Sequence, residues 1–158
     1  MSVDSNNIGK CPYCGSEVVL KDADYVYHSK KAKDYPKVWV CSNYPECDAY
    51  VGCHKGTDVP MGRLANLRLR TLKIEAHKQF DVIWKSRAMT RRTAYYWLAK
   101  HLGINIKDCH IGMFDIKECQ RVIHLCKSFR CKRVDDYRKE HHINKGILTR
   151  GYKTKNNK

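Results

Sequence analysis

The sequence predicts an α+β fold in which a small antiparallel ribbon precedes a helical module of about three helices and a basic C-terminal tail. Three observations support this prediction. Two closely spaced cysteine pairs lie near the start of the chain, short β-branched and aromatic runs surround them, and apolar residues recur at helical spacing further along. The chain is accordingly divided into residues 8–55, 60–130 and 131–158, and the last segment is expected to be partly disordered.

The cysteine pairs of the first segment have the spacing of a metal site. Cys11 and Cys14 flank a Pro-Tyr turn, and Cys41 and Cys47 flank the sequence Ser-Asn-Tyr-Pro-Glu. Four thiolates in two tight turns supply the ligands of a tetrahedral zinc ion, and four protein ligands leave no position for a catalytic water. We therefore expect a zinc ribbon that holds one structural Zn2+ through these four residues.

Short runs around the cysteines predict the strands of the ribbon. They are residues 17–20, 25–28, 37–40 and 49–53. Cys53 and His54, at the end of the last run, either replace or orient a zinc ligand, or are a strand-end cysteine and an exposed histidine. The ribbon aromatics either stack on single-stranded bases or form the thin core of the ribbon and its contact with the helices: Tyr25, Tyr27, Trp39, Tyr44 and Tyr50.

Residues 60–130 contain three segments with a helical apolar pattern. The expected helices are 63–86, 91–102 with Thr90 as the N-cap and Gly103 at the end, and 116–129 with Asp115 as the N-cap. The remaining cysteines and two histidines either pack in the helical core or form a second metal site: Cys109, Cys119, Cys126 and Cys131 with His110 and His124.

The net charge of +15 is unevenly distributed. Residues 1–59 carry 7 Lys and Arg against 8 Asp and Glu, whereas residues 60–129 carry 14 against 5 and residues 130–158 carry 10 against 3. Positive charge attracts polyanions, so nucleic acid is the expected partner of the helical module and the tail. The expected contacts are Arg87, Arg91, Arg92, Tyr95, Lys100, Arg130, Lys132 and Arg133. For the group from Arg87 to Lys100, the alternative is an ordinary solvated face over core aromatics.

Several classes of protein do not match the sequence. No run of about 18 apolar residues could span a membrane, and the first residues lack an apolar export segment, so we expect a cytoplasmic protein with reduced thiols. Phosphate loops, nucleophile motifs and carboxylate clusters are missing, so an enzyme is not expected. The alternative is a nuclease that uses His77, Asp81 and His110, of which the first two otherwise form a local helix-stabilising pair.

Two resemblances add to this interpretation. Cys11-Pro-Tyr-Cys-Gly15 and Cys41-Ser-Asn-Tyr-Pro-Glu-Cys47 resemble the C-terminal zinc ribbons of bacterial type IA topoisomerases, which bind single-stranded DNA. Residues 10–130 resemble a family of small phage- and mobile-element-borne proteins with a zinc-finger domain of unknown function. That resemblance implies a phage, plasmid or genomic-island setting in a bacterial host cell. It is carried by the ribbon cysteines with Cys53-His54, by residues 70–84, by Ala94-Tyr-Tyr-Trp-Leu-Ala99 and by Cys109-His-Ile-Gly-Met-Phe114.

The predicted function is therefore that of a zinc-ribbon protein that binds nucleic acid. We expect a DNA-binding accessory factor in phage or mobile-element replication or processing, with a polymerase, primase or helicase as its protein partner. The alternative is a protein-binding adaptor or inhibitor of the same origin that acts on a host or replication protein.

Overall fold

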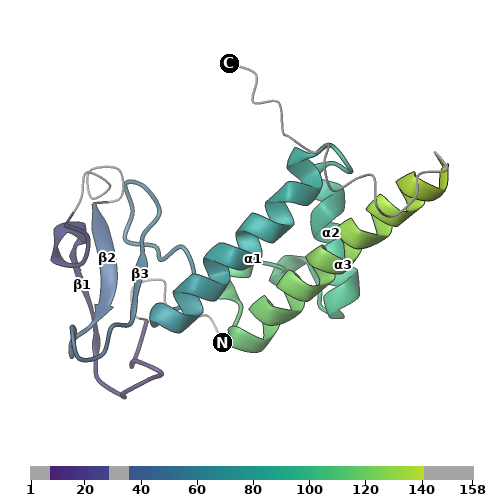
Figure 1. Cartoon of the computed structure of the whole chain (residues 1–158). Helices are drawn as coiled ribbons and strands as arrows, with labels where there is room; N and C mark the ends of the chain where they lie inside the picture. Colours follow the sequence, from purple (N-terminus) through teal and green to yellow (C-terminus); the bar gives the residue numbers. More distant parts are fainter. Residues whose placement is uncertain (1–7, 29–35, 141–158) are drawn as a thin grey trace.

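The computed structural model describes residues 8–28 and 36–140, with side chains as far as residue 130 and at residue 132. Strands β1 (Val18–Asp22), β2 (Lys37–Cys41) and β3 (Tyr50–Gly52) come first, followed by helices α1 (Leu67–Lys85), α2 (Arg91–Leu102) and α3 (Ile116–Glu140). The sheet stands at one end of α1, and the helices lie beyond it (Figure 1). This arrangement confirms the α+β class. The short 3-10 helices between these elements are η1 (Ala23–Tyr25), η3 (Ile106–Asp108) and η4 (Ile111–Met113).

The sheet is antiparallel, in the order β1-β2-β3. Its central strand is the most buried, because β2 has neighbours on both edges and residues 38–41 are all buried. In the register, Val18 lies opposite Cys41 and Asp22 lies opposite Lys37. The two ends of β2 are therefore distinct, with Cys41 at one end and Lys37 at the other.

The predicted strand at residues 25–28 is wrong. The chain forms η1 instead, and the amides of Val26 and Tyr27 both donate to the Ala23 carbonyl, at 3.1 and 2.7 Å. The cause is that β1 pairs directly with β2 as far as Asp22 and Lys37, so β1 and β3 occupy both edges of β2 and leave no place on it for residues 25–28. The aromatic side chains of this segment pack back onto the ribbon, since Tyr27 meets Tyr50 edge-on with ring centroids 5.5 Å apart.

The other ribbon aromatics also have partners within the ribbon. Trp39 is buried, and its indole nitrogen donates to the Asp58 carbonyl at 2.7 Å. The rings of Tyr25 and Tyr44 lie 5.7 Å apart at the surface, where Tyr25 remains about half exposed. Core packing therefore accounts for Trp39, whereas Tyr25 keeps an accessible ring.

The helices begin where capping side chains are found. The Asn66 side chain accepts a hydrogen bond from the Leu69 amide, so α1 starts later than the expected residue 63. Helix α2 has the predicted bounds, with Thr90 as N-cap and Gly103 in the left-handed conformation at its end. Helix α3 starts after Asp115 as predicted, but it continues to Glu140, past the expected end at residue 129.

The predicted tail overlaps this helix. Residues 131–140 belong to α3, and residues 141–158 lie outside the described residues. The three domain boundaries stay predictions.

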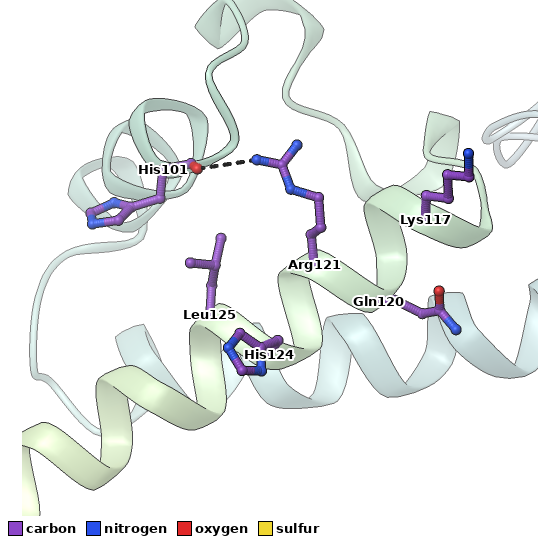
Figure 2. Close-up of a pocket in the computed structure, with 6 residues that line it drawn as sticks. All are labelled: His101, Lys117, Gln120, Arg121, His124 and Leu125. Carbon is purple, nitrogen blue, oxygen red and sulfur yellow. Dashed lines mark hydrogen bonds between the residues drawn. The ribbon is translucent and has the colours of Figure 1, made fainter.

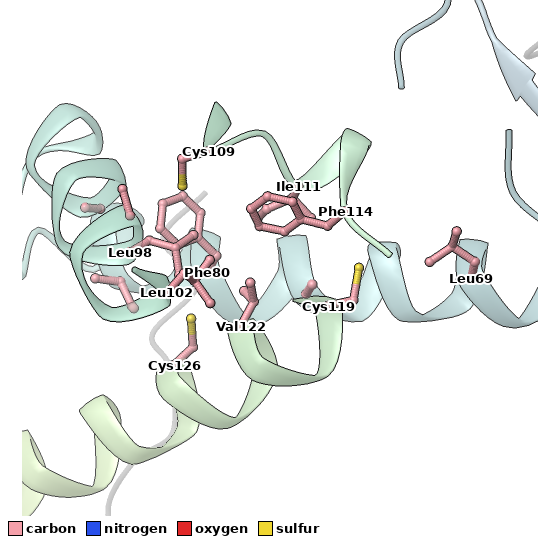
Figure 3. Packing of buried hydrophobic residues seen from close by; sticks show 14 of the residues in the cluster. Leu69, Phe80, Leu98, Leu102, Cys109, Ile111, Phe114, Cys119, Val122 and Cys126 are labelled. Atoms are coloured by element: carbon pink, nitrogen blue, oxygen red, sulfur yellow. The ribbon is translucent and has the colours of Figure 1, made fainter. Parts of the chain in front are cut away.

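The helical module has a substantial core, in which α1 and α3 pack along each other. Phe80, Leu98, Ile111 and Val122 are fully buried in it (Figure 3). Cys109, Cys119 and Cys126 also belong to this core, which is the core-packing alternative for these cysteines and not a second metal site. Burial raises the pKa of Cys109 and Cys119 to about 11 and that of Cys126 to about 12. The side chain of Cys131 lies outside the described residues.

A polar clasp joins the ribbon to α1. The Arg70 guanidinium donates to the Asp48 carboxylate at 3.0 Å and to the backbone carbonyls of Asp48 and Ala65 at 2.6 Å each, and it lies 3.8 Å from the centroid of the Tyr50 ring. The Asp48 carboxylate also accepts the first amide of α1, that of Leu67, at 2.8 Å. The sheet is thus held against the start of the helix by several bonds to one arginine.

A close backbone approach makes the second contact between the two parts. The Arg63 amide donates to the Gly112 carbonyl at 3.1 Å, and a Cβ on Gly62 would lie only 2.2 Å from that oxygen. Any side chain at position 62 would force the two segments apart. Glycine is therefore needed at position 62, where the segment that follows the sheet passes close to η4.

Candidate metal centre and basic surface

The structure brings together the four cysteines that the sequence predicts as zinc ligands. The sulfur of Cys11 lies 3.6 Å from that of Cys47, and the sulfur of Cys14 lies 3.3 Å from that of Cys41. All four sulfurs lie within 4.8 Å of one another. A tetrahedral ion with Zn–S bonds of about 2.3 Å needs sulfurs about 3.8 Å apart. The cluster therefore has the size of a zinc site.

Two tight turns position these sulfurs. In the first, the Gly15 amide donates to the Cys11 carbonyl at 2.9 Å, with Gly15 in the left-handed region at φ 75°. In the second, the amides of Tyr44 and Cys47 donate to the carbonyls of Cys41 and Asn43 at 3.0 and 2.9 Å. Each turn aims its two thiols at the same point, so the site is built by backbone geometry.

The close spacing and the shifted pKa values of the thiols favour a bound cation. Hydrogen bonds from the side chain and backbone of Ser16 lower the pKa of the exposed Cys14 to about 6. Burial instead raises the pKa of Cys41 to about 12, and it also raises that of Cys47. Thiols this close cannot all ionise unless a positive charge sits between them, and a bound divalent metal deprotonates its thiol ligands.

Cys53 and His54 lie at the other end of the ribbon. The Cys53 amide donates to the Lys37 carbonyl at 3.2 Å, so the cysteine lies beside the end of β2 remote from Cys41, about 13 Å away along the strand. Cys53 is buried, and His54 is exposed. Within residues 8–28 and 36–140, the four-cysteine cluster is the only group of three or more side chains placed to hold a metal ion.

Helix α2 and the turn before it carry five of the predicted nucleic-acid contacts. Arg87 is exposed in the turn, where it adopts a positive φ of 59°. Arg91, Arg92 and Lys100 are exposed on α2. Tyr95 is half-buried, and its ring lies 4.7 Å from that of Phe80, so this tyrosine is less accessible than the prediction required.

A hollow of about 380 Å³ opens beside the first turns of α2. Its lining combines cations, aromatic rings and an exposed histidine, and no carboxylate contributes to it: Arg91, Arg92, Tyr95, Tyr96, Ile106, Cys109 and His110. Such a lining suits an anionic ligand with a planar group, which is the chemistry of a nucleotide.

The other predicted contacts are on α3. The Arg130 guanidinium donates to the side-chain oxygen of Gln79 and is half-buried, so its charge is partly occupied within the fold. Lys132 is exposed, and the side chain of Arg133 lies outside the described residues. The predicted set is thus divided between α2 and α3.

The residues of the nuclease alternative have separate partners. The His77 ring is bonded to the Lys73 carbonyl at 2.9 Å, whereas Asp81 accepts from the Trp84 indole and pairs with Lys85 at 2.7 Å. His110 is exposed in the hollow beside α2. The predicted local pairing of His77 with Asp81 is replaced by these other bonds.

Sequence analysis did not single out a second basic hollow, between the end of α2 and α3. It has a volume of about 400 Å³ and no carboxylate in its lining (Figure 2). Lys117 and Arg121 are four residues apart on α3, a spacing that could have revealed one face of this hollow. The full lining is His101, Lys117, Gln120, Arg121, His124 and Leu125.

In the described part of the chain, no helix is both long enough and apolar enough to cross a membrane.

Comparison with known proteins gives one match. A family model described as a zinc-finger-containing domain matches residues 7–129, which include the four clustered cysteines and helices α1 and α2. The matched domain and the cysteine cluster fit one zinc ion. No curated protein and no solved structure matches the chain, and the resemblance to topoisomerase ribbons stays a prediction.

Proposed function

The chain belongs to the family of zinc-finger-containing domains, and from this premise we propose that it is a zinc-ribbon protein that binds nucleic acid, with DNA as the favoured ligand. Its proposed setting is phage or mobile-element replication or processing, as an accessory factor to a polymerase, primase or helicase. The zinc ion has a structural role in this proposal, because four cysteines close its coordination sphere.

Unneutralised charge on the helical module carries the proposal. Among the described residues, ion pairs involve only Lys37, Arg70 and Lys85 as cations. The exposed cations of α2 and α3 therefore keep their charge for an external partner, and the hollow beside α2 adds aromatic and histidine side chains to them. Each phosphate that a cation neutralises releases a condensed counterion, so binding energy of this kind depends steeply on salt.

The test is a titration of zinc-loaded protein into labelled oligonucleotides of scrambled sequence at several salt concentrations. We expect micromolar or tighter binding at low salt that weakens as salt rises. The double variant Arg91→Gln/Arg92→Gln should bind at least about tenfold more weakly. Arg68→Gln/Lys78→Gln, which removes two exposed cations of α1, is the charge-matched control and should change affinity much less. Negligible binding at low salt would contradict the proposal, and cleavage of the oligonucleotide would favour the nuclease alternative.

One observation favours the second candidate, a protein-binding adaptor or inhibitor. Leu67 and Ile74 are 63% and 70% exposed, and they lie seven residues apart on one face of α1. Large contiguous apolar patches are typical of protein contact surfaces, and this pair would form part of such a patch. If Leu67→Ser/Ile74→Ser left nucleic-acid affinity unchanged but abolished binding to a replication protein, the two functions would use separate surfaces.

A further inference from the structure

Helix α2 presents a continuous polar ridge to solvent. Arg92, Tyr96 and Lys100 follow one another at intervals of four residues, so they lie within about 80° of the helix circumference. All three side chains are exposed, and Tyr96 is 50% exposed. The opposite side of α2 is buried in the core through Ala94 and Leu98. The helix contains no acidic residue from Arg91 to Leu102.

The two basic hollows lie on opposite flanks of this ridge. Arg91, about 100° before Arg92 around the helix, borders the hollow that η3 and His110 complete. His101, about 100° beyond Lys100, borders the hollow that α3 completes. Figure 2 shows α3 running past the end of α2 at this second hollow. A single exposed helix is thus bounded on both sides by cationic depressions.

The cations of the second hollow are available to a ligand. The Arg121 guanidinium reaches across to the backbone carbonyl of His101, but the contact is long, at 3.4 Å (Figure 2). Lys117 is exposed and forms no ion pair with any described residue. An anion placed here could take donors from both side chains without breaking a bond of the core.

The two tyrosines at the start of α2 offer at most one exposed ring for stacking. The Arg92 guanidinium lies 5.9 Å from the centroid of the Tyr96 ring, and Arg91 lies 5.7 Å from that of Tyr95, whose ring also packs against Phe80. An unpaired base could stack on Tyr95 only by displacing its packing against Phe80 or the nearby Arg91, whereas the half-exposed Tyr96 ring keeps a surface for a ligand. One exposed ring does not stack successive bases, so the arrangement favours a ligand that meets the ridge with polar edges and the flanks with phosphates.

We propose that α2 enters the major groove of duplex DNA, with the ridge against the base edges and the two basic hollows against the phosphates of the two strands. This inference rests on the proposed nucleic-acid function and gives it a substrate class. The major groove of B-DNA is about 12 Å wide, and a helix with its side chains is about 10–12 Å across. Arg92 and Lys100 carry the donors that the guanine O6 and N7 acceptors require.

Duplex DNA, duplex RNA and single-stranded DNA of one scrambled sequence distinguish the groove from simple charge. Each is titrated with zinc-loaded full-length protein at the same salt concentration. Duplex RNA has equal or greater phosphate density, but its deep, narrow major groove excludes side chains. We expect duplex DNA to bind at least about tenfold more tightly than duplex RNA or the single strand. Equal or tighter binding of either alternative would overturn the proposal.

Charge-matched variants test the ridge and the flanks separately. Arg92→Gln/Lys100→Gln should weaken duplex binding at least about tenfold, whereas Arg68→Gln/Lys78→Gln, which removes two exposed cations of α1, should weaken it only slightly. Lys117→Gln/Arg121→Gln should flatten the salt dependence by about one unit of slope for each lost phosphate contact. Equal losses from the ridge pair and the α1 pair would overturn the groove assignment.

A modified duplex tests the ridge without altering the protein. Replacing guanine by 7-deazaguanine removes the N7 acceptor from the major groove, and we expect affinity to fall for the unmodified protein but not for Arg92→Gln/Lys100→Gln. No fall would overturn the proposal. Zinc content and circular dichroism confirm that each variant is folded. If the protein binds no nucleic acid at all, the proposed function itself fails, and this result differs from loss of duplex preference alone.

Discussion

The ribbon and the helical module stabilise themselves in different ways. The buried residues of the ribbon are few, and two of them, Cys11 and Cys41, belong to the metal cluster. The helical module buries large side chains such as Phe80, Ile83 and Leu98 without any metal. The ribbon has almost balanced charge, whereas residues 60–129 carry 14 basic and 5 acidic residues. The part of the chain that is expected to need an ion to fold is therefore distinct from the part that carries the excess positive charge.

Removal of zinc should give the largest effect and act on one region. Structural zinc contributes about 10–16 kcal/mol in zinc-finger peptides, more than so small a core can replace. A chelator should therefore unfold the ribbon and leave the helices folded. The indole NMR signal of Trp39, which is buried in the ribbon, should move to its unfolded position, while those of Trp84 and Trp97 stay dispersed.

Two checks accompany this experiment. Cys14→Ser should reproduce the effect without chelator, because it removes an exposed thiol of the cluster and no core side chain. Zinc added back to the unmodified protein should restore the Trp39 signal. A Trp39 signal that survives chelation would show that the ribbon is stable without metal, and loss of all three signals together would show that the two regions unfold as one.

Arg70 tests how strongly the regions are coupled. Arg70→Met removes the ion pair with Asp48 and the bonds to two carbonyls, which should cost about 1–3 kcal/mol. In the unmodified protein, chelation should also lower the melting temperature of the helices, because the clasp is lost with the ribbon. In Arg70→Met this decrease should be smaller.

Arg68→Met is the control for the clasp, since Arg68 is exposed two residues earlier on α1. It should melt like the unmodified protein both with and without zinc. An Arg70→Met protein with an unchanged response to chelation would assign the coupling to the Gly62–Gly112 contact instead.

Local sequence signals predicted the elements whose determinants are local. The cysteine spacing identified the four clustered thiols, and Thr90, Gly103 and Asp115 identified the ends of α2 and the start of α3. These signals act over a few residues, through turn geometry and capping bonds.

The remaining features depend on partners distant in sequence. Residues 25–28 have strand-like composition, but β1 and β3 occupy both edges of β2. Composition does not reveal which strands pair with each other. The Asp48–Arg70 clasp joins residues 22 positions apart. The basic hollow at Arg121 needs the end of α2 to lie against α3, so charge spacing on one helix could reveal only half of it.

Lys73 gives the smallest predicted effect. Its charge is partly buried in the helical module, and this burial lowers the stability of the folded state. Burial lowers the pKa of Lys73 from an ordinary 10.5 to about 8, although its ammonium donates to the Arg63 carbonyl at 3.1 Å. Below pH 8 the folded protein keeps this charge partly buried. Between pH 8 and 10.5 the folded state has released the proton that the unfolded state still binds, so this group makes stability rise with pH across that window.

Comparison with Lys73→Met tests the contribution of Lys73 together with its effect on Cys119. The buried cysteines act in the opposite direction, because burial raises the pKa of Cys119 and Cys126 and makes stability fall as pH rises. The Lys73 charge lowers the pKa of Cys119, so its removal raises that pKa further and adds to the same difference between the two proteins. The unfolding free energy of the unmodified protein relative to Lys73→Met, measured by urea denaturation, should therefore increase across the window. Lys78→Met, which removes an exposed lysine of the same helix, should show no such trend. A difference in unfolding free energy between the unmodified protein and Lys73→Met that stays constant with pH would mean that the ammonium is solvated. Its charge would then not lower the stability of the folded state.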